Sequence, residues 1–159
     1  MKLYLKKPLN LSYLLATGFG IGLIKWFPGT LGSIFIIPLW WIISLFSGYL
    51  YLATVLLGFI YGIYICQVTE KYLGLHDHSS IIWDEFIGMG ITFMSLTDYK
   101  LQFVIMGFFI FRFFDILKPW PISWVNDHFN GGLGIMLDDL IAGFISTLCL
   151  YKIYHNFSN

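Results

Sequence analysis

Residues 34–66 read IFIIPLWWIISLFSGYLYLATVLLGFIYGIYIC and contain no charged side chain. An uncharged run of this length favours membrane-spanning helices, because a helix satisfies its own backbone hydrogen bonds in lipid. A turn is predicted around Gly48, and it divides the run into Ser33–Phe46 and Leu50–Cys66. A full crossing needs ~20 apolar residues. We therefore expect the first segment to be tilted, re-entrant or extended by its flanks.

The composition of the whole chain agrees with this prediction. Of its 159 residues, 58% are hydrophobic and only 11% are charged, whereas a soluble domain carries about 25% charged residues. Further apolar runs occupy Phe86–Leu96, Leu101–Phe114 and Leu140–Tyr154, and no repeat or linker divides the chain. We predict an all-α fold: a compact, multi-helix polytopic membrane protein with short spans, in which residues 1–159 form a single domain.

Composition also narrows the partners of the chain. Its net charge is zero, so binding of nucleic acid through bulk electrostatics is not expected. Cys66 and Cys149 lie far apart in apolar runs and are interpreted as reduced, buried thiols. The lysine-rich start is followed by an apolar run that glycines and Lys25 interrupt, so we expect an uncleaved cytoplasmic N-terminus. The sequence is compatible with an oligomer.

The lysines predict which loops face the cytoplasm, because cytoplasmic loops are rich in Lys and Arg. We place Lys25 inside, Gly48 and Asp98–Lys100 outside, and both Gln67–Glu85 and Lys118–Asp139 inside. Of the acidic residues, this arrangement places only Asp98 on the outer side, and Asp115 lies at the end of its apolar run. We therefore expect a multi-pass protein of the cytoplasmic membrane with a cytoplasmic-face active site. The inner acidic residues are Glu70, Asp77, Asp84, Glu85, Asp127, Asp138 and Asp139.

Two acidic motifs predict a cation site. Asp84 and Glu85 enter one apolar run, and Asp138 and Asp139 begin another. An ionised group at the bilayer centre is disfavoured by ~3 kcal/mol or more, so a bound cation is expected to neutralise these carboxylates. Oxygen ligands favour a hard ion such as Mg²⁺ over zinc. Successive helical residues point about 100° apart, so Asp138 and Asp139 need not bind the same ion.

Two glycine-rich motifs, Gly29–Ser33 after Pro28 and Gly131–Gly134, each open an apolar run. Glycine lets the backbone approach a ligand closely, and a helix N-terminus offers unpaired N–H groups to an anion. The alternatives are a helix start capped by Thr30 or Ser33 for the first motif and a flexible turn for the second.

Arg112, Asp115 and Lys118 recur at steps of three and share one helical face, which Pro119 ends. In one interpretation Asp115 holds an ion while Arg112 and Lys118 contact phosphate oxygens. In the other, Arg112 and Asp115 form an ion pair at the membrane boundary and the Lys118 side chain extends towards water.

The motif His76–Asp77–His78 precedes the first acidic pair. Its histidines suit proton transfer, or, less well without cysteines nearby, zinc binding. An ordinary solvated loop explains them equally well.

Carboxylates, cations and glycine-rich motifs on one membrane face together predict metal-assisted chemistry on a phosphorylated membrane substrate. The competing hypothesis is a small polytopic cation-binding transporter, which would place its ionisable groups near mid-membrane. A non-catalytic assembly subunit would leave the boundary carboxylates unexplained.

The ordered set of motifs resembles the phosphatidylglycerophosphatase A family over nearly the whole chain. The resemblance implies a magnesium-dependent phosphoric monoester hydrolase of the bacterial inner membrane, which converts phosphatidylglycerophosphate to phosphatidylglycerol and phosphate in glycerophospholipid synthesis. The motifs that carry it are Ala16–Gly20, Pro28–Ser33, His76–His78, Ile82–Gly88, Phe111–Arg112, Asp115, Lys118–Ile122, Gly131–Asp139 and Ala142–Gly143.

The resemblance and the chemistry of these side chains together assign roles to residues. A water activated by Mg²⁺ is expected to attack phosphorus, and direct attack by an aspartate stays open. The expected metal ligands are Asp84, Glu85, Asp138 and Asp139. The expected phosphate-binding residues are Thr30, Arg112, Lys118 and Gly132. The expected catalytic residues are His76, His78, Asp115 and Asp139.

Overall fold

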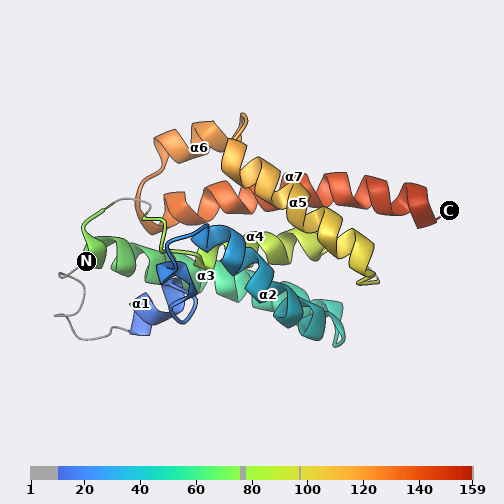
Figure 1. Ribbon diagram of the computed structural model, residues 1–159, viewed down its shortest axis with the longest axis horizontal. Coiled ribbons are helices and arrows are strands. Elements are labelled where there is room, and N and C mark those ends of the chain that lie inside the picture. The colour runs from blue at the N-terminus through green and yellow to red at the C-terminus, as the bar shows by residue number, and fades with distance from the viewer. Residues whose placement is uncertain (1–10, 76–77, 97, 159) are drawn as a thin grey trace.

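The computed structural model describes residues 11–75, 78–96 and 98–158, and it confirms the all-α prediction (Figure 1). The described residues contain no strand. The turn predicted around Gly48 separates two helices, as expected. The elements are α1 (Leu11–Ala16), the 3₁₀ helix η2 (Ile21–Leu23), α2 (Pro28–Ser44), α3 (Gly48–Leu73), α4 (Trp83–Phe93), α5 (Leu101–Leu117), α6 (Ile122–His128) and α7 (Gly131–Ser158).

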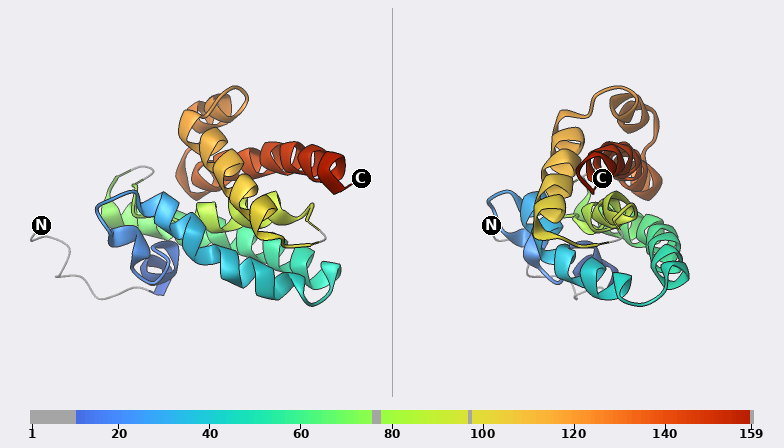
Figure 2. Two further views of the ribbon diagram at one scale, coloured as in Figure 1. Left: turned by 45° about the vertical axis from the view of Figure 1, so that its right-hand side comes forward. Right: turned by 90° about the vertical axis from the view of Figure 1, so that its right-hand side faces the viewer.

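Helix α4 lies in the middle of the molecule, where α2, α3, α5 and α7 pack around it (Figure 2). Every residue from Phe86 to Phe93 is buried, as expected for a helix that is apolar on all sides. With 11 residues it is about 16 Å long, which is shorter than the ~30 Å hydrocarbon core. The apolar run Phe86–Leu96 thus lies largely in a short helix that is enclosed by protein.

Hydrogen bonds from neighbouring helices hold α4 in place. The Trp40 indole N–H of α2 donates to the Phe86 carbonyl at 2.7 Å, and the Tyr51 hydroxyl of α3 donates to the Gly90 carbonyl at 2.6 Å. Gly90 also leaves room for the Trp40 ring, because an added Cβ would lie 2.5 Å from the ring atom Cε2. These contacts fix the position of α4 along its axis, and therefore the position of its first turn.

The backbones of α4 and α7 approach each other closely at two glycines. A Cβ added at Gly143 would lie 2.7 Å from the Gly88 carbonyl oxygen, and one added at Gly88 would lie 3.0 Å from the Asp139 carbonyl oxygen. Both distances are shorter than ordinary van der Waals contact. Small residues at this crossing therefore let the part of α7 from Asp139 to Gly143 lie directly against α4.

Helices α3 and α7 are long and apolar enough to cross a membrane by length and composition. In the most apolar stretch of α3 only 28% of the residues are buried within the protein, and Leu56, Leu57 and Ile60 are exposed. Helix α2 is also apolar but shorter. A large exposed apolar surface is unusual for a protein in water. These features are consistent with a membrane-associated helical protein.

Several helices begin or end at the same end of the molecule. Helices α2, α4 and α7 begin there, and α3 and α5 end there (Figure 1). The α2–α3 and α4–α5 loops and the C-terminus lie at the opposite end. This matches the expectation that the segments around Gly48 and Asp98–Lys100 share one side.

The glycine crossing predicts the effect of a single methyl group. Gly143→Ala should lower the free energy of unfolding by about 1–3 kcal/mol, because the new Cβ meets backbone that cannot rotate away. Thermal unfolding in detergent measures the loss. Gly48→Ala is the control, since its Cβ would meet nothing within 4 Å. Equal melting temperatures for the two variants would contradict the close approach of α4 and α7.

Candidate active site

A cavity of about 400 Å³ lies at the end where α2, α4 and α7 begin and α5 ends. Its wall combines residues that are widely separated in the sequence but were predicted to share one site. We call it the carboxylate cavity. Its polar lining residues are Thr30, Ser79, Asp84, Glu85, Arg112, Asp115, Lys118, Asp138 and Asp139, and Phe27, Pro28, Gly29, Ile81 and Ile116 complete it.

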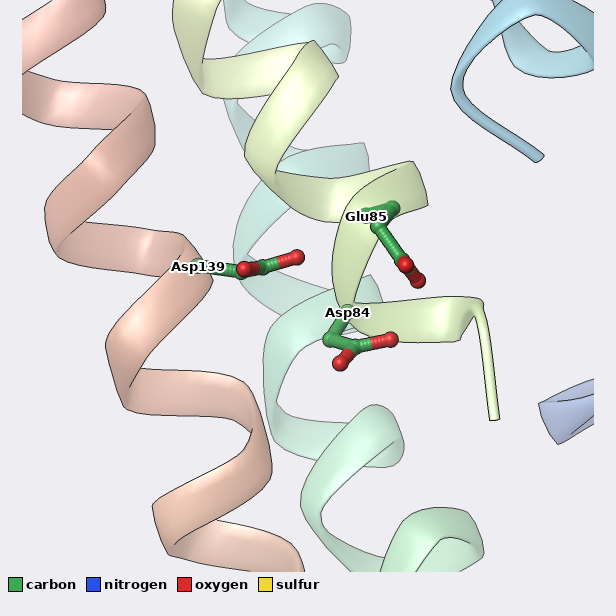
Figure 3. A group of neighbouring side chains, drawn as sticks. All are labelled: Asp84, Glu85 and Asp139. Carbon is green, nitrogen blue, oxygen red and sulfur yellow. The ribbon is translucent and has the colours of Figure 1, made fainter. Parts of the chain in front are cut away.

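Three carboxylates in this cavity lie close enough to bind one ion. Asp84 and Glu85 project from the first turn of α4, and Asp139 points from α7 towards them (Figure 3). One carboxylate oxygen from each lies within 4.8 Å of the others. The two acidic residues in α4 follow the helix start, where the helix dipole favours negative charge. The third carboxylate, that of Asp139, is close because α7 packs against α4 at Gly88 and Gly143.

These carboxylates repel each other in a poorly solvated place. Two unit charges 4.8 Å apart repel by roughly 3 kcal/mol at an effective dielectric constant of 20. Glu85 lies outside the two helices that are long enough to span a membrane. Burial raises its pKa to about 8, and the negative charge of Asp139 is the second cause of that rise. Buried Glu85 Oε2 and Asp139 Oδ2 have no hydrogen-bond partner among the described residues. A cation would stabilise all three groups.

The residues present fit a magnesium ion in particular. Asp84, Glu85 and Asp139 offer only hard oxygen donors, and the described part of the cavity wall contains neither cysteine nor histidine. Carboxylate oxygens without sulfur or imidazole ligands suit Mg²⁺ better than zinc. The buried, unpartnered oxygens of Glu85 and Asp139 are therefore suitable ligand atoms.

Arg112 lies beside the carboxylate group. Its guanidinium forms an ion pair with Asp115, one turn further along α5, and its Nη1 atom lies 3.7 Å from Glu85 Oε1. The Arg112–Asp115 ion pair that the sequence offered as an alternative is thus present, and it faces the cavity rather than lipid. Arg112 Nε has no hydrogen-bond partner among the described residues, so the guanidinium can still donate to an oxyanion.

Lys118 is positioned by the end of α5. It adopts a left-handed backbone conformation with φ 41° and ψ 56° as the helix C-cap. Its ammonium forms an ion pair with Asp138 of α7 and donates to Asn126 Oδ1 of α6 at 2.9 Å. Asp138 therefore contacts Lys118 and is not in the group of three carboxylates. Its predicted role as a metal ligand stays a prediction.

The start of α2 forms the wall of the cavity that faces Glu85 and Arg112. Phe27 is the N-cap and its side chain makes no capping bond, while Ser33 donates to the Gly29 carbonyl, so neither Thr30 nor Ser33 caps the helix. Pro28 has no N–H and the Leu31 N–H donates to the Phe27 carbonyl, so the N–H groups of Gly29 and Thr30 are those without a partner within the helix, and both residues line the cavity. A Cβ at Gly29 would collide with Glu85 Oε1 and lie 3.2 Å from Arg112 Nη1.

Some predicted site residues lie elsewhere. Gly132 is in the first turn of α7, where its N–H donates to Gln67 Oε1 of α3 at 3.0 Å. The second glycine-rich motif therefore forms the start of α7, packed against α3, and the phosphate-binding role of Gly132 stays a prediction. His78 does not line the carboxylate cavity, and His76 lies outside the described residues.

Sequence reasoning missed Asn126 and the close approach of Gly29 to Glu85. Asn126 follows Lys118 by eight residues across Pro119 and Pro121, and only the turn between α5 and α6 brings it back. No spacing rule for a regular helix predicts that contact. Gly29 was recognised as a glycine suited to close approach, but its neighbour comes from a distant part of the chain.

Fold and site together define a helical, apolar protein whose acidic cavity suits a cation and a phosphate group. Residues 14–154 match the family model described as Phosphatidylglycerophosphatase A. The chain belongs to the phosphatidylglycerophosphatase A family.

Named relatives agree with this assignment. The Phosphatidylglycerophosphatase A of Escherichia coli K12 is 50% identical over 92% of this chain and 86% of its own length. The protein of that name from Haemophilus influenzae is 41% identical over 92% and 91%. A Bacteroides thetaiotaomicron relative, provisionally named a phosphatidylinositol-3-phosphatase, is 33% identical over 92% and 95%. No solved structure matches the chain.

The Lys118–Asp138 pair predicts a measurable coupling. Asp138→Asn should lower the free energy of unfolding by about 1–3 kcal/mol, because it leaves the Lys118 charge in a mostly buried place. The further change Lys118→Met should restore part of that loss. A double-mutant cycle by thermal unfolding should therefore give a coupling of ~1 kcal/mol. Strictly additive effects would show that the two side chains do not interact.

Proposed function

We propose that this protein hydrolyses the terminal phosphomonoester of phosphatidylglycerophosphate, with Mg²⁺ held by the carboxylate cavity. The names of the two relatives at 50% and 41% identity support the substrate. The observation that carries the proposal is the group Asp84, Glu85 and Asp139, which shares one cavity with Arg112 and Lys118.

The charge of the cavity supports a divalent cation. Five carboxylates and two basic side chains line it, so full ionisation would leave an excess of three negative charges. A phosphomonoester carries up to two further negative charges, and it would be repelled. A doubly charged ion between the carboxylates and the phosphate would lower that excess from three negative charges to one and would attract the phosphate at short range. This balance explains why an acidic cavity suits an acidic substrate.

The side chains divide the work on the proposed substrate. Magnesium, when bound, would supply positive charge next to the phosphate and help to activate a water molecule. Arg112 and Lys118 would donate to phosphate oxygens, together with the backbone N–H groups of Gly29 and Thr30 at the start of α2. Such preorganised donors stabilise the charge that develops in the transition state.

Proton transfer is assigned to Asp115. It lies in the cavity and is paired with Arg112. Water would attack phosphorus as Asp115 takes its proton, the bond from phosphorus to the glycerol oxygen would break, and that oxygen would receive the proton. The sequence also offered His76, His78 and Asp139. Of these, His76 lies outside the described residues, His78 lies outside this cavity, and Asp139 belongs to the group of three carboxylates.

We also propose that the cavity faces the cytoplasm in a bacterial inner membrane. Lys25, Lys71 and Lys118 lie at or near the end that carries the cavity, whereas Lys100 and Lys152 lie towards the other end. An excess of basic residues on one side favours the cytoplasm for that side. Asp84, Glu85 and Asp115 lie in terminal turns of their helices, and Asp138 and Asp139 lie in the first half of α7. The similar proteins give no support to the transporter alternative.

Phosphate release from phosphatidylglycerophosphate by purified, detergent-solubilised protein tests the proposal. We expect release with Mg²⁺ and none with a chelator. Asp139→Asn should lower kcat/KM at least ~100-fold, since it removes a ligand that both binds the ion and balances charge. Mg²⁺ should also raise the melting temperature of the wild type and not that of the variant.

Asp98→Asn is the matched control, because Asp98 is exposed and lies in the α4–α5 loop at the opposite end. It should keep both the activity and the response to Mg²⁺. Full activity in the presence of the chelator would refute the magnesium proposal. A folded wild type that releases phosphate from a phosphoinositide but not from phosphatidylglycerophosphate would refute the substrate.

The contact between α2 and the carboxylates gives a second prediction. Gly29→Ala would place a methyl group where Glu85 Oε1 lies. We expect kcat/KM to fall ~10-fold or more, with the protein still folded, because Glu85 and Arg112 must move. Gly48→Ala, with open space around its Cβ, should keep full activity. Unchanged activity in Gly29→Ala would contradict the placement of Glu85 against α2.

A further inference from the structure

A second cavity of about 470 Å³ adjoins the carboxylate cavity. The two share Pro28 and Ser79 in their walls, so a molecule that extends past these residues enters both. We call it the adjoining cavity. Its remaining lining residues are Tyr13, Gly22, Leu23, Ile24, Lys25, Leu73, His78 and Ser80.

Lys25 is the charged side chain in the lining of the adjoining cavity. The ion pairs of the carboxylate cavity belong to Arg112 and Lys118, and Lys25 takes part in none of them. Apart from Lys25 and His78, the wall contains mostly apolar side chains and small residues. A single cation against such a wall suits an anion of one negative charge that is attached to an apolar body.

His78 is held in a form that can donate a hydrogen bond. The backbone N–H of Ser80 donates to His78 Nδ1 at 3.1 Å, and the Ser80 hydroxyl lies 2.8 Å from the same atom. A backbone N–H can only donate, so Nδ1 is the acceptor and the proton of a neutral imidazole is on Nε2. The Nε2–H group is therefore available to an oxyanion.

We propose that the adjoining cavity binds the phosphodiester of the lipid substrate, with Lys25 and His78 as its ligands. This inference rests on the proposed function. Phosphatidylglycerophosphate carries a monoester and a diester separated by one glycerol. When the monoester is in the carboxylate cavity, the diester lies one glycerol away, past Pro28 and Ser79. The diester has one negative charge, which matches the single lysine.

The proposal gives His78 a binding role in place of the proton transfer expected from the sequence. It also explains how the site would discriminate among phosphomonoesters. A lipid whose phosphate is attached directly to diacylglycerol has no diester to contact Lys25. Such a lipid loses a charge-assisted interaction and should be a poorer substrate.

Binding of phosphatidylglycerol tests the proposal without turnover, because this lipid carries the diester but no monoester. Dihexanoyl phosphatidylglycerol would be titrated by calorimetry into wild type and variants in a non-ionic detergent. Lys25→Gln should weaken binding ~10-fold, and His78→Gln should weaken it less. Lys152→Gln, an exposed lysine near the end of α7, is the matched control and should bind as the wild type does.

Turnover supplies the second measurement. Lys25→Gln should raise KM for phosphatidylglycerophosphate by a similar factor and leave kcat/KM for phosphatidic acid, which lacks the diester, unchanged. The proposal is overturned if phosphatidylglycerol does not bind the wild type, or if it binds Lys25→Gln and wild type equally. Binding that depends on Lys25 in a protein that does not hydrolyse phosphatidylglycerophosphate would instead overturn the proposed function alone.

Discussion

The close contact between α4 and α7 determines where the groups of the site lie. With glycine at positions 88 and 143, the two backbones meet at a distance that a larger residue would prevent. Asp139 on α7 then faces Asp84 and Glu85 on α4. Hydrogen bonds from α2 and α3 to carbonyl groups of α4 prevent that helix from sliding. The geometry of the carboxylates is thus set by packing in the middle of the protein.

The same arrangement holds an excess of negative charge in a poorly solvated place. Helix α4 is short and buried, so its acidic first turn is held near apolar protein and away from bulk water. Arg112 and Lys118 each have a carboxylate partner in the cavity, and they leave an excess of negative charge. A bound divalent ion would remove most of that excess and at the same time provide the charge that a phosphate substrate needs. Stability of the site and its chemistry therefore depend on the same ion.

Much of this could be predicted from the sequence. The uncharged residues 34–66 predicted two helices with a turn at Gly48, and the acidic and basic motifs predicted that Asp84, Glu85 and Arg112 meet at one end. These predictions hold because apolar periodicity and the burial of charge act locally or constrain whole segments. Contacts made by tertiary packing were beyond sequence rules.

Gly132 shows why, since a glycine that permits close approach does not specify which partner approaches it. The partner that the Gly132 N–H has in the structure is Gln67 of α3. His78 is a similar case, because it was expected to act with the carboxylates, yet it lines the adjoining cavity and accepts from the Ser80 backbone N–H. Asn126 reaches Lys118 only through the α5–α6 turn.

Binding of a paramagnetic substitute for Mg²⁺ tests the central claim most directly. Electron paramagnetic resonance of Mn²⁺ titrated into the purified protein should show bound ion that Mg²⁺ displaces, and Asp84→Asn should abolish this binding while the protein stays folded. Equal Mn²⁺ binding by the wild type and Asp84→Asn would contradict the claim that packing of α4 against α7 builds a cation site.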